Sequence, residues 1–287
     1  MTQVAFVAVH GMGETPPEYA EKVFAEVARR IPRSKAQIAM GSVYYQKILQ
    51  DNETEVWNRV SRNAKVNYDH LRRFLLFGFG DAAGLENGKE FDHSPYEMAQ
   101  LDIARTLLAA REQFGANPRL VLLTHSLGCQ VMSNYIYDAQ KAEHSRVNLG
   151  IWKDIQRFAF AISGRPELTP DEITFLRADT CTGWISTGCN IPIFVAAHKN
   201  MLVIPIRRPN DQFKWLNIYD PDDVLGWPLQ PLSPGYHDLV EDRVINAGAG
   251  MMDWLLKSWN PLAHQVYWLD EDVLKPLEAM LLGSTAR

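Results

Sequence analysis

A serine, Ser126, lies where an apolar segment of the chain meets a segment with helical spacing. The apolar run at residues 120–124 is typical of a buried strand in a parallel sheet, and residues 129–137 continue with helical periodicity. A strand, a tight turn and a helix with a serine at the apex predict a nucleophile elbow, which holds the hydroxyl clear of the sheet. Gly128 suits this turn because the helix must approach the strand closely. The usual pattern is G-x-S-x-G, and Thr124 stands at its first glycine.

A glycine-rich turn follows the first apolar segment, where residues 4–9 predict a buried strand that ends in His10-Gly11-Met12-Gly13. The glycines allow the backbone to turn so that an amide can face a bound oxygen. An ordinary turn between a strand and a helix would have the same pattern. A dinucleotide-binding loop is disfavoured, because a third glycine and a ribose-binding acid after the next strand are missing. Together with the serine turn, the His-Gly-x-Gly segment is a stronger indication of an oxygen-binding site.

Three carboxylates cluster after another strand, which is predicted at residues 215–219. Asp220, Asp222 and Asp223 could form only a solvated turn, or they could bind calcium, which takes clustered oxygen ligands. A carboxylate downstream of the serine turn is also where a hydrolase needs the acid that orients its histidine. Asp223 and Asp220 are both candidates for that role.

Two histidines could supply the base. His264 lies on a predicted loop before the last helix, and it follows the short apolar piece at 244–245 that could form the final strand. His237 precedes that piece. A fold built on a nucleophile elbow has its catalytic histidine after the final strand, which favours His264. His125 is expected to pack or to form hydrogen bonds, because consecutive side chains diverge at a turn.

The elements that must position these residues predict an α/β fold with a mostly parallel central sheet and helices on both faces. No internal repeat or low-complexity linker divides the chain, so residues 1–287 are expected to form a single domain. Further strands are predicted at 38–45, 157–162 and 182–187, and an edge strand at 202–206. Helices are predicted at 16–30, 95–114 and 270–282, together with a short helix that Thr169 or Pro170 opens. A tight turn is predicted at 188–192.

The region from about residue 51 to 92 is longer than a normal crossover. Its apolar residues recur at roughly helical spacing, and the helix at 95–114 already supplies a crossover, so this region is interpreted as a helical insertion. Residues this apolar, including Phe77 and Phe79, must be buried, because an exposed patch of that size would favour aggregation. They could form a cap or pocket wall over a substrate site, or a helix pair packed on the main core.

Composition excludes several classes of protein. The chain has 287 residues, 46% of them hydrophobic and 22% charged, which is ordinary for a globular protein. A net charge of −5 without a basic tract argues against a nucleic-acid surface. The three cysteines have no metal-ligand spacing, and their odd, sparse count fits a reducing compartment. No apolar run is long enough to span a bilayer and no signal peptide is evident, so a cytoplasmic protein is expected.

The order Ser126, Asp223, His264 is the order of the α/β-hydrolases. The chain resembles this superfamily, and within it the esterase- and lipase-like serine hydrolases that begin directly with the His-Gly strand. It is also similar to a group of uncharacterised bacterial hydrolases through Gly188-Cys-Asn-Ile-Pro192, Tyr219-Asp-Pro-Asp-Asp-Val-Leu-Gly226, and Trp259-Asn-Pro-Leu-Ala-His264 with Tyr267-Trp268. These blocks are scattered over the core and leave residues 51–92 unassigned.

The resemblance implies a catalytic triad. Ser126 would attack an acyl carbonyl, His264 would take the serine proton and later give it to the leaving group, and Asp223 would hold the imidazole. Asp223 is preferred to Asp220, because compact lipases place a few turn residues between strand and acid. The backbone amides of Met12 and Leu127 would form the oxyanion hole. No cofactor or metal is implied.

The implied function is hydrolysis of a small-molecule carboxylic ester. Thioesterase or acyltransferase chemistry would use the same residues. The serine argues against dehalogenase or epoxide-hydrolase chemistry, which is expected to use an aspartate at the elbow. A hydrolase-fold binding protein without catalysis is the alternative from another class, and the complete, correctly ordered set of three residues argues against it.

Overall fold

The computed structural model describes residues 2–145, 147, 149–197, 203–245 and 267–283. Its centre is a sheet of six parallel strands in the order β2-β1-β3-β4-β5-β6. The α/β architecture and the parallel sheet expected from the sequence are therefore confirmed. The strands are β1 (Thr2–Val9), β2 (Ala36–Val43), β3 (Arg119–His125), β4 (Cys181–Thr187), β5 (Lys214–Tyr219) and β6 (Val240–Val244).

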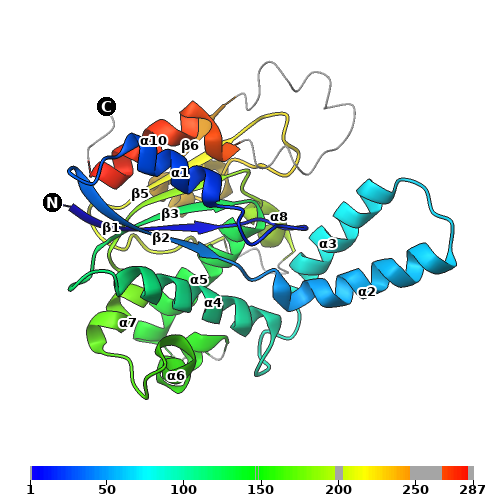
Figure 1. Cartoon of the computed structure of the whole chain (residues 1–287), viewed down its shortest axis with the longest axis horizontal. Coiled ribbons are helices and arrows are strands. Elements are labelled where there is room, and N and C mark those ends of the chain that lie inside the picture. The colour runs from blue at the N-terminus through cyan, green and yellow to red at the C-terminus, as the bar shows by residue number, and fades with distance from the viewer. Residues whose placement is uncertain (1, 146, 148, 198–202, 246–266, 284–287) are drawn as a thin grey trace.

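Helices cover both faces of the sheet (Figure 1). On one face α1 (Glu21–Arg30) and α10 (Glu271–Leu282) lie side by side. The other carries α4 (Pro95–Arg111), α5 (Leu127–His144), α6 (Ala159–Ser163) and α7 (Pro170–Leu176). Alternate strand residues enter the two cores: Phe6 and Val121 pack with the first pair of helices, and Val7 and Leu122 with the second group. This burial on both faces explains the continuous apolar runs of the central strands.

The strand order contains a switch of direction at β1. The chain passes from β1 to β2 on one side, and then crosses to β3 on the other side of β1. In open α/β sheets, ligands bind beyond the carboxyl ends of the strands at such a switch point. The loop that follows β1 and the turn that follows β3 therefore meet at the place where the topology favours a binding site.

Two predicted strands are absent from the described residues. Residues 157–162 form the end of η2 (Ile155–Phe158) and most of α6, with Ala159 and Ile162 buried and Phe160 exposed. A short apolar run fits either period, and here packing selects the helix. Residues 203–206 join no sheet, and Pro205 has no N–H to donate to one. Residue 202 lies outside the described residues.

The other predicted elements are present with shifted ends. The first helix begins at Glu21, because Pro16 to Ala20 form a turn in which Tyr19 N–H donates to Pro16 O. Thr169 opens α7 with a reciprocal capping box to Glu172, as the sequence indicates. The final strand begins at Val240 and includes only the first residue of the expected 244–245 piece. The remaining elements are η1 (Ile151–Lys153), α8 (Ile191–Ala196), η3 (Gln230–Leu232) and α9 (Pro234–Leu239).

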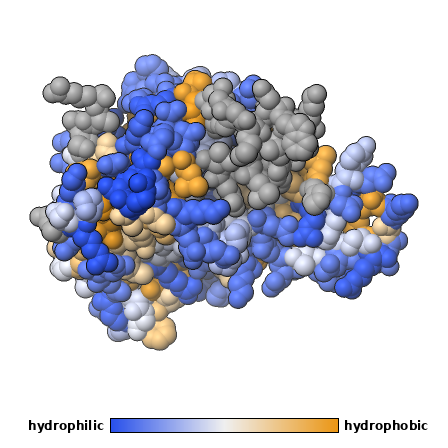
Figure 2. Space-filling model, turned by 45° about the horizontal axis from the view of Figure 1, so that its top comes forward, coloured by the Kyte–Doolittle hydropathy of each residue, from blue (hydrophilic) through white to orange (hydrophobic). Residues whose placement is uncertain are grey.

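The inserted region forms a helix pair, α2 (Lys47–Asn63) and α3 (Asp69–Glu86), that extends from the body (Figure 1). Phe77 is buried, as expected, but Phe79 is 68% exposed, and Leu71 and Leu75 on the same stripe of α3 are also exposed. Figure 2 shows apolar side chains of this pair among hydrophilic ones. The expectation that the insertion buries all its large apolar residues is wrong, because a projecting pair has a second face that the body does not reach. Within the described residues, no helix combines the length and apolarity needed to cross a bilayer.

A carboxyl group is buried between the two inserted helices. Glu53 of α2 is 6% exposed and lies against Gly80 of α3, where an added Cβ would overlap the Glu53 carboxyl. Burial, followed by the nearby charges of Asp81 and Glu14, raises the pKa of Glu53 to about 8. The group is therefore protonated in the folded protein at neutral pH.

This burial predicts a pH-dependent stability. The folded state keeps the proton on Glu53 up to about pH 8, whereas the unfolded chain releases it near 4.5. The contribution of Glu53 to the free energy of unfolding is therefore fully present below about pH 4.5. It falls as the pH rises from there and is lost once Glu53 ionises in the folded protein at about pH 8. Glu53→Gln, which cannot ionise, is expected to gain melting temperature relative to the wild type between about pH 5 and pH 9 in thermal scans. Glu55→Gln changes an exposed glutamate of the same helix and is the control; equal curves for both variants would contradict the assignment.

Candidate active site

Ser126 lies at the apex of the sharp turn between β3 and α5 that the sequence predicts. Its backbone has φ +49° and ψ −122°, and its side chain is buried. A non-glycine residue in such a sparsely populated region costs on the order of 1–3 kcal/mol. The turn is held by the Ser126 N–H, which donates to Thr187 O at 3.0 Å, and by the Cys129 N–H, which donates to Ser126 O at 3.0 Å. Strain at a strand–helix junction with a serine at its apex is the geometry of a nucleophile elbow.

Two glycines allow the elbow to touch the end of β1. A Cβ added to Gly128 would stand 2.2 Å from the carbonyl oxygen of His10, and one added to Gly11 would stand 2.8 Å from Ser126 Cβ. No side chain fits at either position without a shift of the backbone or of Ser126. The close helix approach expected at Gly128 is therefore present, and the His-Gly-x-Gly segment lies directly against the serine.

The loop after β1 is held on one side by aromatic residues. The His10 ring stacks on Tyr45 at a centroid distance of 4.2 Å, and the Tyr45 hydroxyl donates to His10 O at 2.9 Å. The His10 Nδ1–H donates to Gly11 O at 2.7 Å. Burial lowers the pKa of His10 to about 4, so the imidazole is neutral at physiological pH. His10 therefore positions the loop and carries no charge into the site.

Thr124, the departure from the usual glycine of the motif, has a buried partner. Its hydroxyl accepts a hydrogen bond from Trp184 Nε1–H at 2.9 Å and donates to Cys129 Sγ at 3.1 Å. The threonine therefore links β3 to β4 and to the first turn of α5. Because both hydroxyl functions are satisfied, the substitution leaves the elbow intact.

His125 takes part in a hydrogen-bond network, as expected for a residue that points away from the serine. Its Nδ1–H donates to Thr187 Oγ1 at 3.0 Å, and Trp268 Nε1–H donates to the same oxygen at 3.2 Å. The Thr187 hydroxyl in turn donates to Thr124 O at 3.1 Å. This network connects the elbow to β4 and to the segment before α10, and the sequence contains no local signal for it.

The acid loop begins where β5 ends. Asp220 is buried, and its Oδ1 accepts a hydrogen bond from Asp222 N–H at 2.9 Å. Asp223 is half-buried, and its Oδ1 accepts from Leu225 N–H at 3.0 Å. A Cβ added to Gly188 would stand 3.1 Å from Asp223 Oδ2 and 2.9 Å from His125 Cε1, so the Asp223 carboxylate lies beside the elbow strand.

Tyr267 connects the two candidate acids, a role that the sequence alone does not indicate. Its hydroxyl accepts from Asp220 N–H at 3.2 Å and donates to Asp223 Oδ2 at 3.0 Å. Burial, and then the adjacent Asp223 carboxylate, raises the pKa of Tyr267 above its ordinary value, so the phenol remains a donor at neutral pH. Each carboxylate oxygen has two lone pairs, and Asp223 can therefore accept a further hydrogen bond at either oxygen besides those from Leu225 N–H and the Tyr267 hydroxyl.

The structure brings together four of the predicted site elements and separates a fifth. Ser126, Leu127, the loop with Met12 and the Asp220–Asp223 turn all lie at the carboxyl ends of β1, β3 and β5. His237 lies on α9, directly before β6, and is therefore at the opposite edge of a parallel sheet. His264 lies outside the described residues. Among the described residues, no three His, Cys, Asp or Glu side chains form a group that could hold a metal ion.

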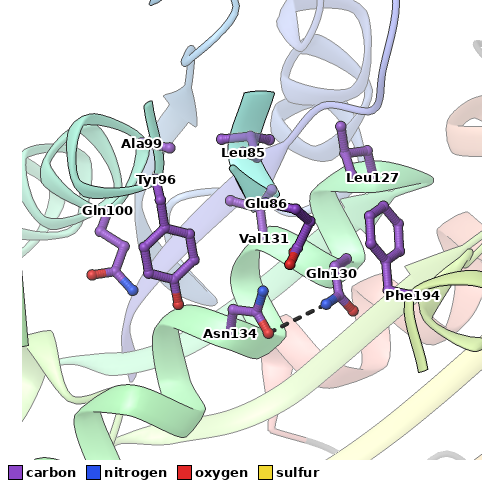
Figure 3. A pocket seen from close by; sticks show the side chains of 10 residues that line it. All are labelled: Leu85, Glu86, Tyr96, Ala99, Gln100, Leu127, Gln130, Val131, Asn134 and Phe194. Carbon is purple, nitrogen blue, oxygen red and sulfur yellow. Dashed lines mark hydrogen bonds between the residues drawn. The ribbon is translucent and has the colours of Figure 1, made fainter. Parts of the chain in front are cut away.

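A narrow pocket begins at Leu127, the residue after the serine. The cavity itself measures only about 10 Å³, room for about one water molecule, within a hollow of about 290 Å³ that includes open solvent. Figure 3 shows Leu127 and Phe194 at one end and Tyr96 and Gln100 at the other. Leu85 and Glu86 of α3, Ala99 of α4, and Gln130, Val131 and Asn134 of α5 complete the lining. The inserted helix pair therefore contributes the end of α3 to a mainly apolar pocket beside the elbow.

No family model matches this chain, and no curated protein is significantly similar to it. Its function therefore has to be inferred from the geometry of the site.

The contact at Gly128 generates a stability prediction. In Gly128→Ala the added methyl meets the backbone at His10, which cannot yield as a flexible side chain would, so the variant is expected to lose about 1–3 kcal/mol of unfolding free energy. Gly115→Ala places the same methyl where no atom lies within 4 Å and is expected to stay within about 0.5 kcal/mol of the wild type. Urea denaturation of both variants measures the difference, and equal midpoints would show that the elbow does not need this close approach.

Proposed function

We propose that this protein is a serine hydrolase of the α/β-hydrolase fold that cleaves carboxylic esters through an acyl-enzyme on Ser126. The observation that carries the proposal is the strained serine elbow with Gly11 packed against it. A turn that only connects a strand to a helix does not require a serine with a φ of +49° beside a glycine-rich loop. The position at the switch point of a parallel sheet supports the same conclusion.

The order of the candidate groups along the sheet also supports this fold. The serine follows β3, the acids follow β5 on the same edge, and His264 follows β6 in the sequence. Side chains at the carboxyl ends of parallel strands share one edge, so these positions suit a triad assembled from three separate loops. The Ser, Asp, His order along the chain is that of the α/β-hydrolases.

The proposed reaction has two steps. Ser126 Oγ attacks the ester carbonyl while His264 takes the hydroxyl proton, and the tetrahedral intermediate collapses as His264 gives that proton to the leaving alcohol. Water then attacks the acyl-enzyme by the same route and releases the acid and free Ser126. Asp223 orients His264 and stabilises its cation, while the Tyr267 hydroxyl holds the Asp223 carboxylate at 3.0 Å.

Two amides are proposed to stabilise the oxyanion. Leu127 begins α5, and the first amides of a helix have no acceptor within the helix. In the loop after β1, the Gly13 N–H already donates to Asp81 Oδ2 at 2.9 Å. The neighbouring Met12 N–H is therefore the loop amide proposed for the second donor.

The pocket beside Leu127 is proposed to receive the acyl chain. Apolar surface lines it mainly, with Leu85, Val131 and Phe194 among its side chains, and these side chains must move apart to admit an acyl chain. This assignment differs from an acyl wall made of Phe77 and Phe79, because Phe79 is exposed and neither residue lines the pocket.

The decisive test of the proposal is the reactivity of Ser126. A fluorophosphonate probe is expected to label the wild type and not Ser126→Ala, and hydrolysis of short p-nitrophenyl esters is expected to fall on the order of 10⁶-fold in kcat. Equal labelling or equal turnover in the two proteins would show that the chain is not a serine hydrolase.

The same ester assay distinguishes the two candidate acids. Asp223→Asn is expected to lower kcat about 10⁴-fold and Asp220→Asn much less. The reverse order would transfer the role to Asp220.

The pocket predicts a change in chain-length preference. Val131→Trp fills the pocket and is expected to lower kcat/KM for hexanoate and octanoate esters. Each methylene that can no longer be buried costs about 0.8 kcal/mol, which is a few-fold in kcat/KM. Acetate ester turnover is expected to stay near the wild-type rate. Val60→Trp makes the same substitution at an exposed site on α2 and serves as control. An unchanged chain-length profile in Val131→Trp would place the acyl site elsewhere.

A further inference from the structure

The inserted helix pair contacts the loop after β1 through a buried carboxylate. Asp81 of α3 is 1% exposed, and its Oδ2 accepts hydrogen bonds from Gly13 N–H at 2.9 Å and from Gln46 Nε2 at 3.0 Å. The same Gln46 amide also donates to Gly13 O. Both backbone groups of Gly13 are thus bound by side chains that come from outside the loop.

The same face of α3 also touches Met12. A Cβ added to Gly78, one helical turn before Asp81, would stand 2.9 Å from Met12 Sδ. Residues three apart on a helix lie on one face, so Gly78 and Asp81 meet two consecutive loop residues. The helix therefore covers Met12 by contact and holds Gly13 by a hydrogen bond.

Packing alone does not confine this part of the loop. Gly13 has φ +87°, and an added Cβ there would meet no atom within 4 Å. Gly13 is buried but has no side chain to hold it, so its position depends on its hydrogen bonds: Asp81 and Gln46 bind it from outside the loop, and the Thr15 hydroxyl donates to Gly13 O at 3.3 Å from within it. An oxyanion donor stabilises the transition state only if it is already aimed before the reaction. The Met12 amide is one peptide away from the bond to Asp81.

We propose, on the basis of the function proposed above, that Asp81 is a positioning residue that holds the Met12 amide in the oxyanion hole. The helical insertion then has a defined task for the reaction, because its α3 helix restrains the catalytic loop as well as lining the pocket. Asp81 acts through the loop and does not touch the substrate.

The charges around Asp81 are compatible with this role. Glu53 on α2 is the neighbouring carboxyl, and its raised pKa of about 8 leaves it neutral, so a single negative charge remains beneath the loop. Burial raises the pKa of Asp81 to about 6, while the hydrogen bonds from Gly13 and Gln46 oppose that rise. Asp81 is therefore mostly ionised at neutral pH. Its acceptor function does not require the charge, which makes asparagine a conservative replacement.

The test compares Asp81→Ala, Asp81→Asn and Glu53→Ala. Loss of one oxyanion donor costs about 10²–10³-fold in kcat, and Asp81→Ala is expected to approach this loss with KM changed only a few-fold. Asp81→Asn keeps an oxygen for Gly13 and is expected to recover most of kcat. Glu53→Ala removes a buried carboxyl of the same helix pair that forms no hydrogen bond to the loop, and is expected to keep the wild-type kcat. A kcat near wild type in Asp81→Ala, or equal losses in Asp81→Ala and Glu53→Ala, would overturn the proposal.

Hydrogen exchange of the peptide that contains residues 10–15 gives a readout that does not need activity. Exchange at Gly13 is expected to accelerate at least tenfold in Asp81→Ala, and to stay near the wild-type rate in Asp81→Asn and Glu53→Ala. Unchanged exchange in Asp81→Ala would overturn the restraint even if Ser126 is reactive. A wild type that fails to react with a fluorophosphonate would instead refute the proposed function, and the exchange result would still decide whether Asp81 holds the loop. If Asp81→Ala does not fold, Asp81→Ser is used, since its side chain is too short to reach Gly13.

Discussion

The close contact between the end of β1 and the turn after β3 is the constraint on which the rest of the site depends. The two strands are neighbours in the sheet, and Gly11 and Gly128 let their loops meet without intervening side chains. Any larger residue at Gly128 would meet the backbone at His10. The contact brings a glycine-rich loop, a serine and a helix start to one point, where the proposed nucleophile and oxyanion donors would have to meet.

Local strain at Ser126 persists because buried hydrogen bonds surround it. The Thr187 hydroxyl binds the elbow strand, the His125 ring and the Trp268 indole at once, and Thr124 binds Trp184. Buried polar groups of this kind rigidify a structure when all of them are satisfied, because breaking one bond would leave its partner unpaired in a low-dielectric interior. The sheet and its network therefore stabilise a backbone conformation that is unfavourable for an isolated serine.

The helix pair α2–α3 combines features that usually occur apart. Its outer stripe exposes Leu71, Leu75 and Phe79, whereas its inner side buries Glu53 and Asp81 near the loop after β1. Burying a carboxyl group is costly unless hydrogen bonds or neutralisation compensate it. Asp81 accepts hydrogen bonds from Gly13 and Gln46, whereas Glu53 stays protonated and therefore neutral. The desolvation cost of burial is thus offset differently in the two carboxyl groups. A helix pair that served only to connect two strands would not require two buried carboxyl groups, and their burial agrees with the positioning role proposed for Asp81.

The sequence by itself determined the features that depend on neighbouring residues. Continuous apolar runs predicted β1 and β3, Ser126 and Gly128 predicted the turn, and Thr169 marked a helix start. Residues 157–162 were misassigned because a short apolar run has no unique period. Only the tertiary structure decided the strand order and the partners of Gly13 and Asp223. Asp81 lies 68 residues from Gly13, and Tyr267 lies 44 residues from Asp223. Packing of whole helices and strands creates such pairs, and no local pattern encodes them.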